Sequence, residues 1–198
     1  MLTLRKKTLH KATALTLCLS ALASFQVQAE DKPLSLWNKM KEYTVELKDG
    51  PITITRKKTP PAIIRGFLQP MVPAEGVTPV GEIDVIEAMG RADSMIVDMR
   101  QQDHVVQLGT IPGSVNIPFT EVAMNMDQFG CESEGNGWDC SSATTKVFAF
   151  CNSSTCPQSP RGIRSMIAEG YPADLIYYYR GGYQEWTIHG LTTVEVSF

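Results

Sequence analysis

The sequence has no surplus of basic residues, since 18 lysines and arginines stand against 21 aspartates and glutamates. A protein that binds nucleic acid needs a basic face for the phosphate backbone, so the composition argues against a nucleic-acid partner. Histidine is scarce as well, with three residues in 198. Neither His104 nor His189 stands in a recognisable catalytic setting, which argues against a cysteine protease.

Long apolar runs are also missing. The uncharged run of residues 12–25 is shorter than the roughly 20 residues that span a bilayer. It follows three basic residues and precedes Val27-Gln28-Ala29, which is the pattern of a signal peptide and its cleavage site. We therefore predict a signal peptide over residues 1–29, cleavage near Ala29, a periplasmic or secreted mature protein and no stable membrane anchor. Cleavage removes four basic residues and no acid, leaving 14 basic against 21 acidic residues and a net charge of −7.

Four cysteines remain after cleavage: Cys131, Cys140, Cys151 and Cys156. In an oxidising compartment, an even number of cysteines favours disulfides. Cys131 and Cys140 bracket a polar loop with two glycines, and we predict a structural disulfide between them. The alternative is a zinc site made by all four cysteines. Its spacings are not those of paired C-x2-C knuckles, so we predict no metal.

The mature chain divides into a short extension and a main domain. In the extension, residues 30–61, two alternating segments at Tyr43–Leu47 and Ile52–Thr55 flank Asp49-Gly50. Alternation on both sides of a turn dipeptide predicts a small β-hairpin. We place the main domain at residues 62–198.

The main domain alternates between helical and strand patterns. Thr78-Pro79 predicts the start of a helix that ends at Gly90. Short apolar strands are predicted at residues 94–98, 114–118, 147–150 and 174–179, with helical patterns between them. This alternation predicts an α/β domain with a mainly parallel central sheet flanked by helices.

The most informative segment is the apolar strand that ends at Cys151. A short polar loop and a helical pattern follow it. Backbone N–H groups converge at the N-terminus of a helix, where they stabilise a thiolate and bind anions. We therefore predict Cys151 as the catalytic residue, in an anion-binding loop made by Asn152, Ser153, Ser154 and Thr155.

Three segments in this order resemble the rhodanese (thiosulfate sulfurtransferase) family. They are Ile96–Arg100 (IVDMR), Gly109–Pro118 (GTIPGSVNIP), and the Cys151 loop followed by Arg180–Trp186 (RGGYQEW). The resemblance implies a rhodanese-like fold and implies that Cys151 carries a sulfane sulfur as a persulfide. It further implies a small sulfur-containing anion, thiosulfate or a related donor, as the substrate, a thiophilic acceptor and no cofactor.

The loop departs from the family at its end, where many members carry an arginine. Cys156 stands there in this chain. Arg161 and Arg180 are therefore candidates for binding the donor anion. Asp98 and Arg100 are expected to pair and to brace the active loop.

Cys156 is the candidate resolving or redox partner of Cys151, because a second thiol can attack a persulfide or form a disulfide. A thiol–disulfide oxidoreductase that uses both cysteines, with a periplasmic thiol or redox protein as partner, is thus an alternative. Its spacing is C-x4-C rather than the C-x2-C of thioredoxin-like motifs. A non-catalytic rhodanese-like binding module is another alternative. A phosphatase of the Cys-x5-Arg type is disfavoured, because Pro157 stands at the arginine position.

Overall fold

The computed structural model describes residues 40–56 and 68–197. Several predictions fall outside the described residues. They are the signal peptide, the first part of the extension and the domain boundary at residue 62.

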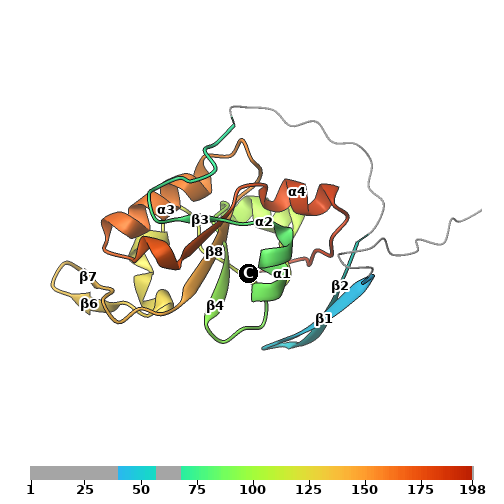
Figure 1. Ribbon diagram of the computed structural model, residues 1–198, viewed down its shortest axis with the longest axis horizontal. Helices are drawn as coiled ribbons and strands as arrows, with labels where there is room; N and C mark the ends of the chain where they lie inside the picture. Colours follow the sequence, from blue (N-terminus) through green and yellow to red (C-terminus); the bar gives the residue numbers. More distant parts are fainter. Residues whose placement is uncertain (1–39, 57–67, 198) are drawn as a thin grey trace, which may run out of the picture. The chain divides into compact units, whose positions relative to one another are not determined.

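The centre of the domain is a parallel sheet of five strands (Figure 1). In spatial order the strands are β3 (Thr78–Pro79), β9 (Ile176–Tyr179), β8 (Lys146–Phe150), β4 (Ser94–Asp98) and β5 (Ser114–Asn116). Every neighbouring pair is parallel. The predicted α/β class with a mainly parallel sheet is therefore confirmed.

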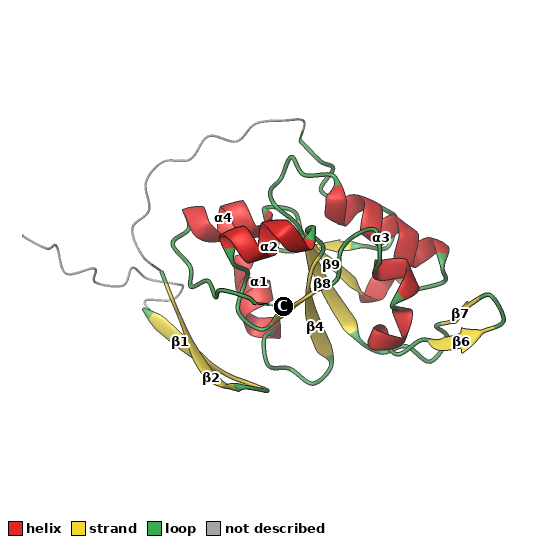
Figure 2. Ribbon diagram, turned by 180° about the vertical axis from the view of Figure 1, so that it is seen from behind, coloured by secondary structure: helices red, strands yellow, loops and turns green. Residues whose placement is uncertain are grey.

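Helices cover both faces of this sheet, as two opposite views agree (Figures 1 and 2). The α-helices are α1 (Glu82–Ala88), α2 (Gln102–Leu108), α3 (Gln158–Ala168) and α4 (Gly182–Ile188). The 3-10 turns are η1 (Val122–Met124), η2 (Met126–Phe129) and η3 (Ala173–Leu175). The helix α3 packs with η1 and η2 in one apolar cluster, and α1 and α4 belong to a second cluster.

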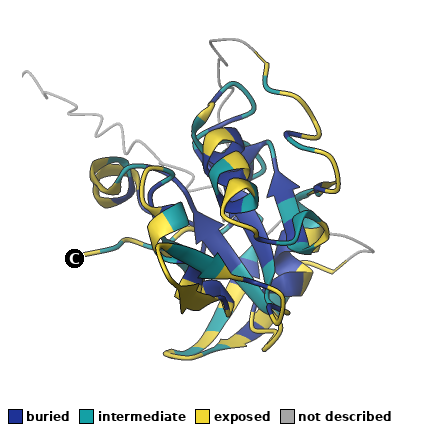
Figure 3. Cartoon of the chain, turned by 90° about the vertical axis from the view of Figure 1, so that its left-hand side faces the viewer, coloured by how far each residue is buried: buried dark blue, intermediate teal, exposed yellow. Residues whose placement is uncertain are grey.

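The three inner strands β4, β8 and β9 are largely buried on both faces, which explains why they are mostly apolar. In β8, Val147 and Ala149 point into the cluster of α3, and Phe148 and Phe150 point into the cluster of α1 and α4. Figure 3 shows the resulting pattern, with buried strands inside and exposed residues on the outer sides of the helices. The end of β8 is therefore held from both sides.

The predicted hairpin is confirmed as an antiparallel pair of strands, β1 (Glu42–Leu47) and β2 (Gly50–Thr55). Its turn differs by one residue from the prediction. Gly50 pairs with Leu47, so that Lys48 and Asp49 form the connection. Val45 and Ile54 are buried in the cluster of α1 and α4, so this hairpin is part of the core.

The predicted helix start at Thr78-Pro79 is wrong. These two residues form β3, which pairs with Tyr177 and Tyr178 at the edge of the sheet, and α1 begins only at Glu82. A proline is tolerated there because an edge strand has one side without ladder hydrogen bonds. The local pattern could not reveal this pairing, because its partner lies about 100 residues away.

A small antiparallel pair, β6 (Glu132–Glu134) and β7 (Gly137–Asp139), lies between η2 and β8. A disulfide joins Cys131 and Cys140 at its base, with a Cα–Cα distance of 4.2 Å. This is the pair that the spacing predicted. Among the described residues, no helix has both the length and the apolar character of a bilayer-spanning segment.

Candidate active site

The loop between β8 and α3 carries the two free cysteines of the described chain. Cys151 directly follows β8, and its side chain is 1% exposed. The Phe150 carbonyl accepts a hydrogen bond of 2.9 Å from the Met99 N–H, which fixes the end of β8 beside β4. Cys151 thus lies at the carboxyl edge of the sheet, where parallel α/β domains place their ligands.

The sulfur of Cys151 has polar partners on both sides. The Ser159 hydroxyl donates to Cys151 Sγ over 3.0 Å, and Cys151 Sγ donates to the Cys156 carbonyl over 3.4 Å. Burial raises the pKa of the Cys151 thiol well above its ordinary value, and contact with the Cys156 sulfur raises it further. Hydrogen bonding with Ser159 lowers the pKa of Cys151, but by less than burial raises it. Cys151 is therefore the protonated member of the cysteine pair.

Cys156 is the anionic member. The neighbouring Cys151 side chain is the largest influence on Cys156 and outweighs burial, and together with the N–H groups of Gln158 and Asn152 it lowers the pKa of Cys156 to about 6. The Asn152 side chain donates from Nδ2 to Cys156 Sγ over 3.8 Å. A sulfur that accepts several N–H donors at the start of a helix is stabilised as a thiolate.

The prediction that residues 152–155 bind an anion at Cys151 stays a prediction. In the structure, Asn152 directs its donors to Cys156. Ser153 and Thr155 bond each other through their hydroxyl groups at 3.0 Å. Ser154 offers its carbonyl to the Gln69 N–H at 2.8 Å.

Two residues of the site escaped the sequence analysis. Ser159, which is fully buried in the first turn of α3, bonds the Cys151 sulfur. In α2, Nδ1 of His104 lies 3.3 Å from Nδ2 of Asn152. Asn152 Nδ2 also lies 3.3 Å from the Gln158 side-chain oxygen. No sequence signal pointed to His104, because it reaches the loop from 48 positions upstream.

The first turn of α4 donates hydrogen bonds to the cysteine loop. The Tyr183 N–H donates to the Cys151 carbonyl over 2.9 Å, and the Gln184 N–H donates to the Asn152 carbonyl over 2.8 Å. Gly182 permits this approach, since its φ is +62° and a Cβ there would lie 2.3 Å from the Cys151 carbonyl oxygen. The glycine pair therefore has a structural role beside the thiols.

Asp98 and Arg100 form the predicted pair, and both side chains are fully buried. Arg100 Nε donates to both carboxylate oxygens of Asp98 at 2.9 and 3.0 Å, and Nη2 reaches one of them at 2.5 Å. Arg100 also binds the Gly109 carbonyl at 2.7 Å and lies 4.2 Å from the centre of the Tyr183 ring. The pair thus braces the turn at Gly109 and the start of α4, which in turn bonds the cysteine loop.

The two candidate anion-binding arginines do not converge on the thiols. Arg180 donates from Nη1 to the Gln69 carbonyl over 3.3 Å, and Gln69 in turn contacts the carbonyls of Ser154 and Thr155. Arg161 is exposed on α3. Arg180 therefore fixes a neighbouring segment against the loop.

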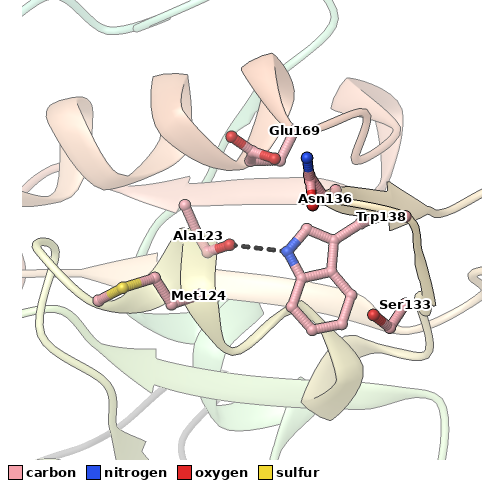
Figure 4. Close-up of a pocket in the computed structure, with 8 residues that line it drawn as sticks. Ala123, Met124, Ser133, Asn136, Trp138 and Glu169 are labelled. Atoms are coloured by element: carbon pink, nitrogen blue, oxygen red, sulfur yellow. Dashed lines mark hydrogen bonds between the residues drawn. The ribbon is translucent and has the colours of Figure 1, made fainter.

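A separate cavity of about 410 Å³ lies near the disulfide-closed hairpin (Figure 4). Trp138 donates from its indole N–H to the Ala123 carbonyl over 3.0 Å, and Glu169 and Asn136 also line the space. None of its lining residues belongs to the cysteine loop. In residues 40–56 and 68–197, no group of three or more metal-ligating side chains is placed to hold a metal ion.

The charge on Cys156 predicts a pH profile for alkylation. Iodoacetamide should modify Cys156 at a nearly constant rate above about pH 7, and the rate should fall about tenfold per pH unit below pH 6, because only the thiolate reacts. Peptide mapping after timed alkylation measures this rate. In Cys151→Ala the midpoint should move upward, because the main donor to Cys156 is lost. A wild-type midpoint near the ordinary thiol value of about 8.5 would contradict the assignment.

The fold and the site together define an α/β domain with a cysteine loop between a central parallel strand and a helix. The model of the rhodanese-like domain matches residues 83–189, which is more than half of the chain. The chain therefore belongs to the rhodanese-like domain family, and the predicted family and fold are confirmed.

Solved structures with a similar fold come from several organisms. A protein of unknown function from Rhodopseudomonas palustris CGA009, described as a possible tyrosine phosphatase, is 19% identical with a TM-score of 0.48, over 69% of this chain and 99% of its own. A human single-domain sulfurtransferase is 20% identical with a TM-score of 0.39, over 55% and 93%. A rhodanese-like domain from Anabaena sp. is 15% identical with a TM-score of 0.40, over 54% and 69%. No curated protein matches the sequence significantly.

Proposed function

We propose that the protein is an exported sulfurtransferase that carries sulfane sulfur as a persulfide on Cys151. The observation that carries the proposal is the position of Cys151 at the end of β8, in contact with a second thiol that is anionic near neutral pH. Family membership supports the same chemistry. The signal-peptide pattern and the Cys131–Cys140 disulfide support export to an oxidising compartment.

Cys156 supplies the base that Cys151 needs. Cys151 is protonated, and its thiol donates a hydrogen bond to the backbone carbonyl of Cys156, beside the Cys156 thiolate. As Cys151 Sγ attacks the outer sulfur of thiosulfate, its proton passes to Cys156. The new S–S bond forms on Cys151, the S–S bond of thiosulfate breaks, and sulfite leaves with the electron pair. The Ser159 hydroxyl, 3.0 Å from Cys151 Sγ, stabilises the charge on the attacking sulfur.

The partners that follow from this chemistry are a small sulfur-containing anion as donor and a thiol as acceptor. Thiosulfate and benzenethiosulfonate both present a terminal sulfane sulfur and differ in their leaving group. Because Cys151 is 1% exposed, the donor reaches it only when the loop or a neighbouring segment opens. Gln69, which bonds the carbonyls of Ser154 and Thr155, lies on such a segment.

To test the proposal, the reduced protein is exposed to either donor, the released sulfite or benzenesulfinate is measured, and the added sulfur is located by peptide mass. The wild-type protein should release sulfite or benzenesulfinate, and Cys151→Ser should lower this release by at least about a thousandfold, as expected for loss of a covalent nucleophile. Cys156→Ser is the matched control. It should still gain one sulfur atom on Cys151, at a lower rate because the base is lost.

Two other results would point elsewhere. If neither donor adds sulfur to Cys151 in Cys156→Ser, and the wild type forms a reversible Cys151–Cys156 disulfide without release of sulfite or benzenesulfinate, the thiol–disulfide oxidoreductase would be favoured. Absence of both the adduct and the disulfide would favour a non-catalytic binding module.

A further inference from the structure

The two thiols of the loop are arranged for a second reaction after sulfur transfer. Cys151 Sγ lies 3.4 Å from the carbonyl oxygen of Cys156, and a backbone hydrogen bond of 2.9 Å from the Cys156 N–H to the Ser153 carbonyl turns the loop back toward Cys151. Cys156 is 9% exposed and Cys151 is 1% exposed. A thiolate thus already lies beside the sulfur that would carry the persulfide.

We propose that Cys156 resolves the Cys151 persulfide, so that the loop reduces sulfane sulfur to sulfide and becomes a Cys151–Cys156 disulfide. This inference rests on the proposed function, because it begins from the Cys151 persulfide. It makes Cys156, a residue of the same loop, the first thiol that reacts with the persulfide. It also adds a reductase activity to the transfer activity.

The step balances in atoms and electrons. The Cys156 thiolate attacks Cys151 Sγ, a bond forms between the two Sγ atoms, and the bond from Cys151 Sγ to the outer sulfur breaks. The outer sulfur leaves with the electron pair as HS⁻, taking the proton that Cys156 had accepted from Cys151. Two thiol sulfurs are oxidised to a disulfide while the sulfane sulfur gains two electrons.

The loop contains the groups that favour this direction of attack. Before the transfer, N–H donors from Asn152 and Gln158 hold negative charge on Cys156. After the transfer Cys156 holds the proton of Cys151, and it must lose that proton before it attacks. The N–H donors of Asn152 and Gln158 lower the pKa of Cys156, so that it becomes a thiolate again near neutral pH. Attacking thiols with a pKa near the ambient pH combine thiolate content with nucleophilicity.

The cycle needs an external dithiol, either a small dithiol or a dithiol protein, to reduce the Cys151–Cys156 disulfide. The more exposed sulfur, Cys156, is the one on which the mixed disulfide with this reductant would form. The net reaction converts thiosulfate and a dithiol into sulfite, sulfide and a disulfide.

A single-turnover experiment tests the inference on the reduced protein after removal of reductant. Thiosulfate or benzenethiosulfonate is added, sulfide is measured, and alkylated peptides are mapped by mass. We expect about one sulfide per chain from the wild type, together with a Cys151–Cys156 disulfide. Cys156→Ser should retain the persulfide on Cys151 and release at least about tenfold less sulfide. Cys156→Ala serves as a second variant, and circular dichroism checks that both fold.

The failures of the two proposals are distinguishable. A stable wild-type persulfide without sulfide or disulfide would overturn this inference and leave the proposed function intact. A disulfide that forms equally without the donor would also overturn it. If no donor loads sulfur on Cys151 even in Cys156→Ser, the proposed function fails, and this inference fails with it.

Discussion

Replacement of Asp98 by asparagine is expected to lower the free energy of unfolding by about 3–5 kcal/mol, the usual cost of removing one partner of a buried ion pair. Asp98 accepts hydrogen bonds from the Arg100 guanidinium, from the Arg100 N–H at 3.1 Å and from the Thr110 hydroxyl at 2.6 Å. Both charged side chains are fully buried. The variant leaves a guanidinium without a counter-charge in the interior, where solvent cannot compensate.

Urea unfolding monitored by circular dichroism measures the effect. The matched control is Asp93→Asn, which removes the partner of Lys146 and Arg91 at the protein surface. Its effect should be much smaller, because water screens exposed ion pairs. Equal unfolding midpoints for Asp98→Asn and the wild type would show that the Arg100 charge is satisfied without Asp98.

Replacement of Gly182 by alanine is expected to disrupt the cysteine loop and lower the free energy of unfolding by about 2–5 kcal/mol, combining backbone strain with overpacking. The new Cβ would lie 2.3 Å from the Cys151 carbonyl oxygen and 3.0 Å from the Asn152 carbonyl carbon. These neighbours are backbone atoms, which cannot move without shifting the loop. Sulfur transfer should fall at least about tenfold, since a displacement on the order of 1 Å at a catalytic group costs more than that.

Gly135→Ala separates the two contributions. Gly135 has a similar φ of +58°, but nothing lies within 4 Å of a Cβ at that position. This control should cost only the left-handed backbone conformation, about 1–2 kcal/mol, and leave sulfur transfer unchanged. If Gly182→Ala behaves like Gly135→Ala in both unfolding and transfer rate, the close approach of α4 to the loop is not required.

The location of Cys151 was predictable from local sequence. An apolar strand that ends at Cys151 and precedes a helical pattern places the thiol at the sheet edge, and the structure agrees. The Cys131–Cys140 pair was also predictable, because a nine-residue separation around a glycine-containing turn allows few partners. In both cases, the relevant neighbours are close in the sequence.

The chemistry of the two thiols was not predictable in the same way. We expected the loop donors at Cys151, whereas the structure directs them to Cys156 and leaves Cys151 protonated. The direction of an N–H group depends on the φ and ψ angles of each loop residue, and packing against α4 and the segment of Gln69 determines these angles. Composition and spacing contain no information on them.

By itself the sequence determined the α/β alternation of the main domain, the N-terminal hairpin and the position of Cys151, because hydrophobic periodicity and turn residues act over a few neighbours. Tertiary structure alone decided that Thr78-Pro79 is an edge strand, that His104 reaches Asn152, and that Cys156 holds the negative charge. The first two outcomes depend on contacts between distant segments, and the third depends on the backbone conformation of the folded loop. Burial and hydrogen bonding at such contacts control the pKa of a thiol, so its reactivity is a property of the folded chain.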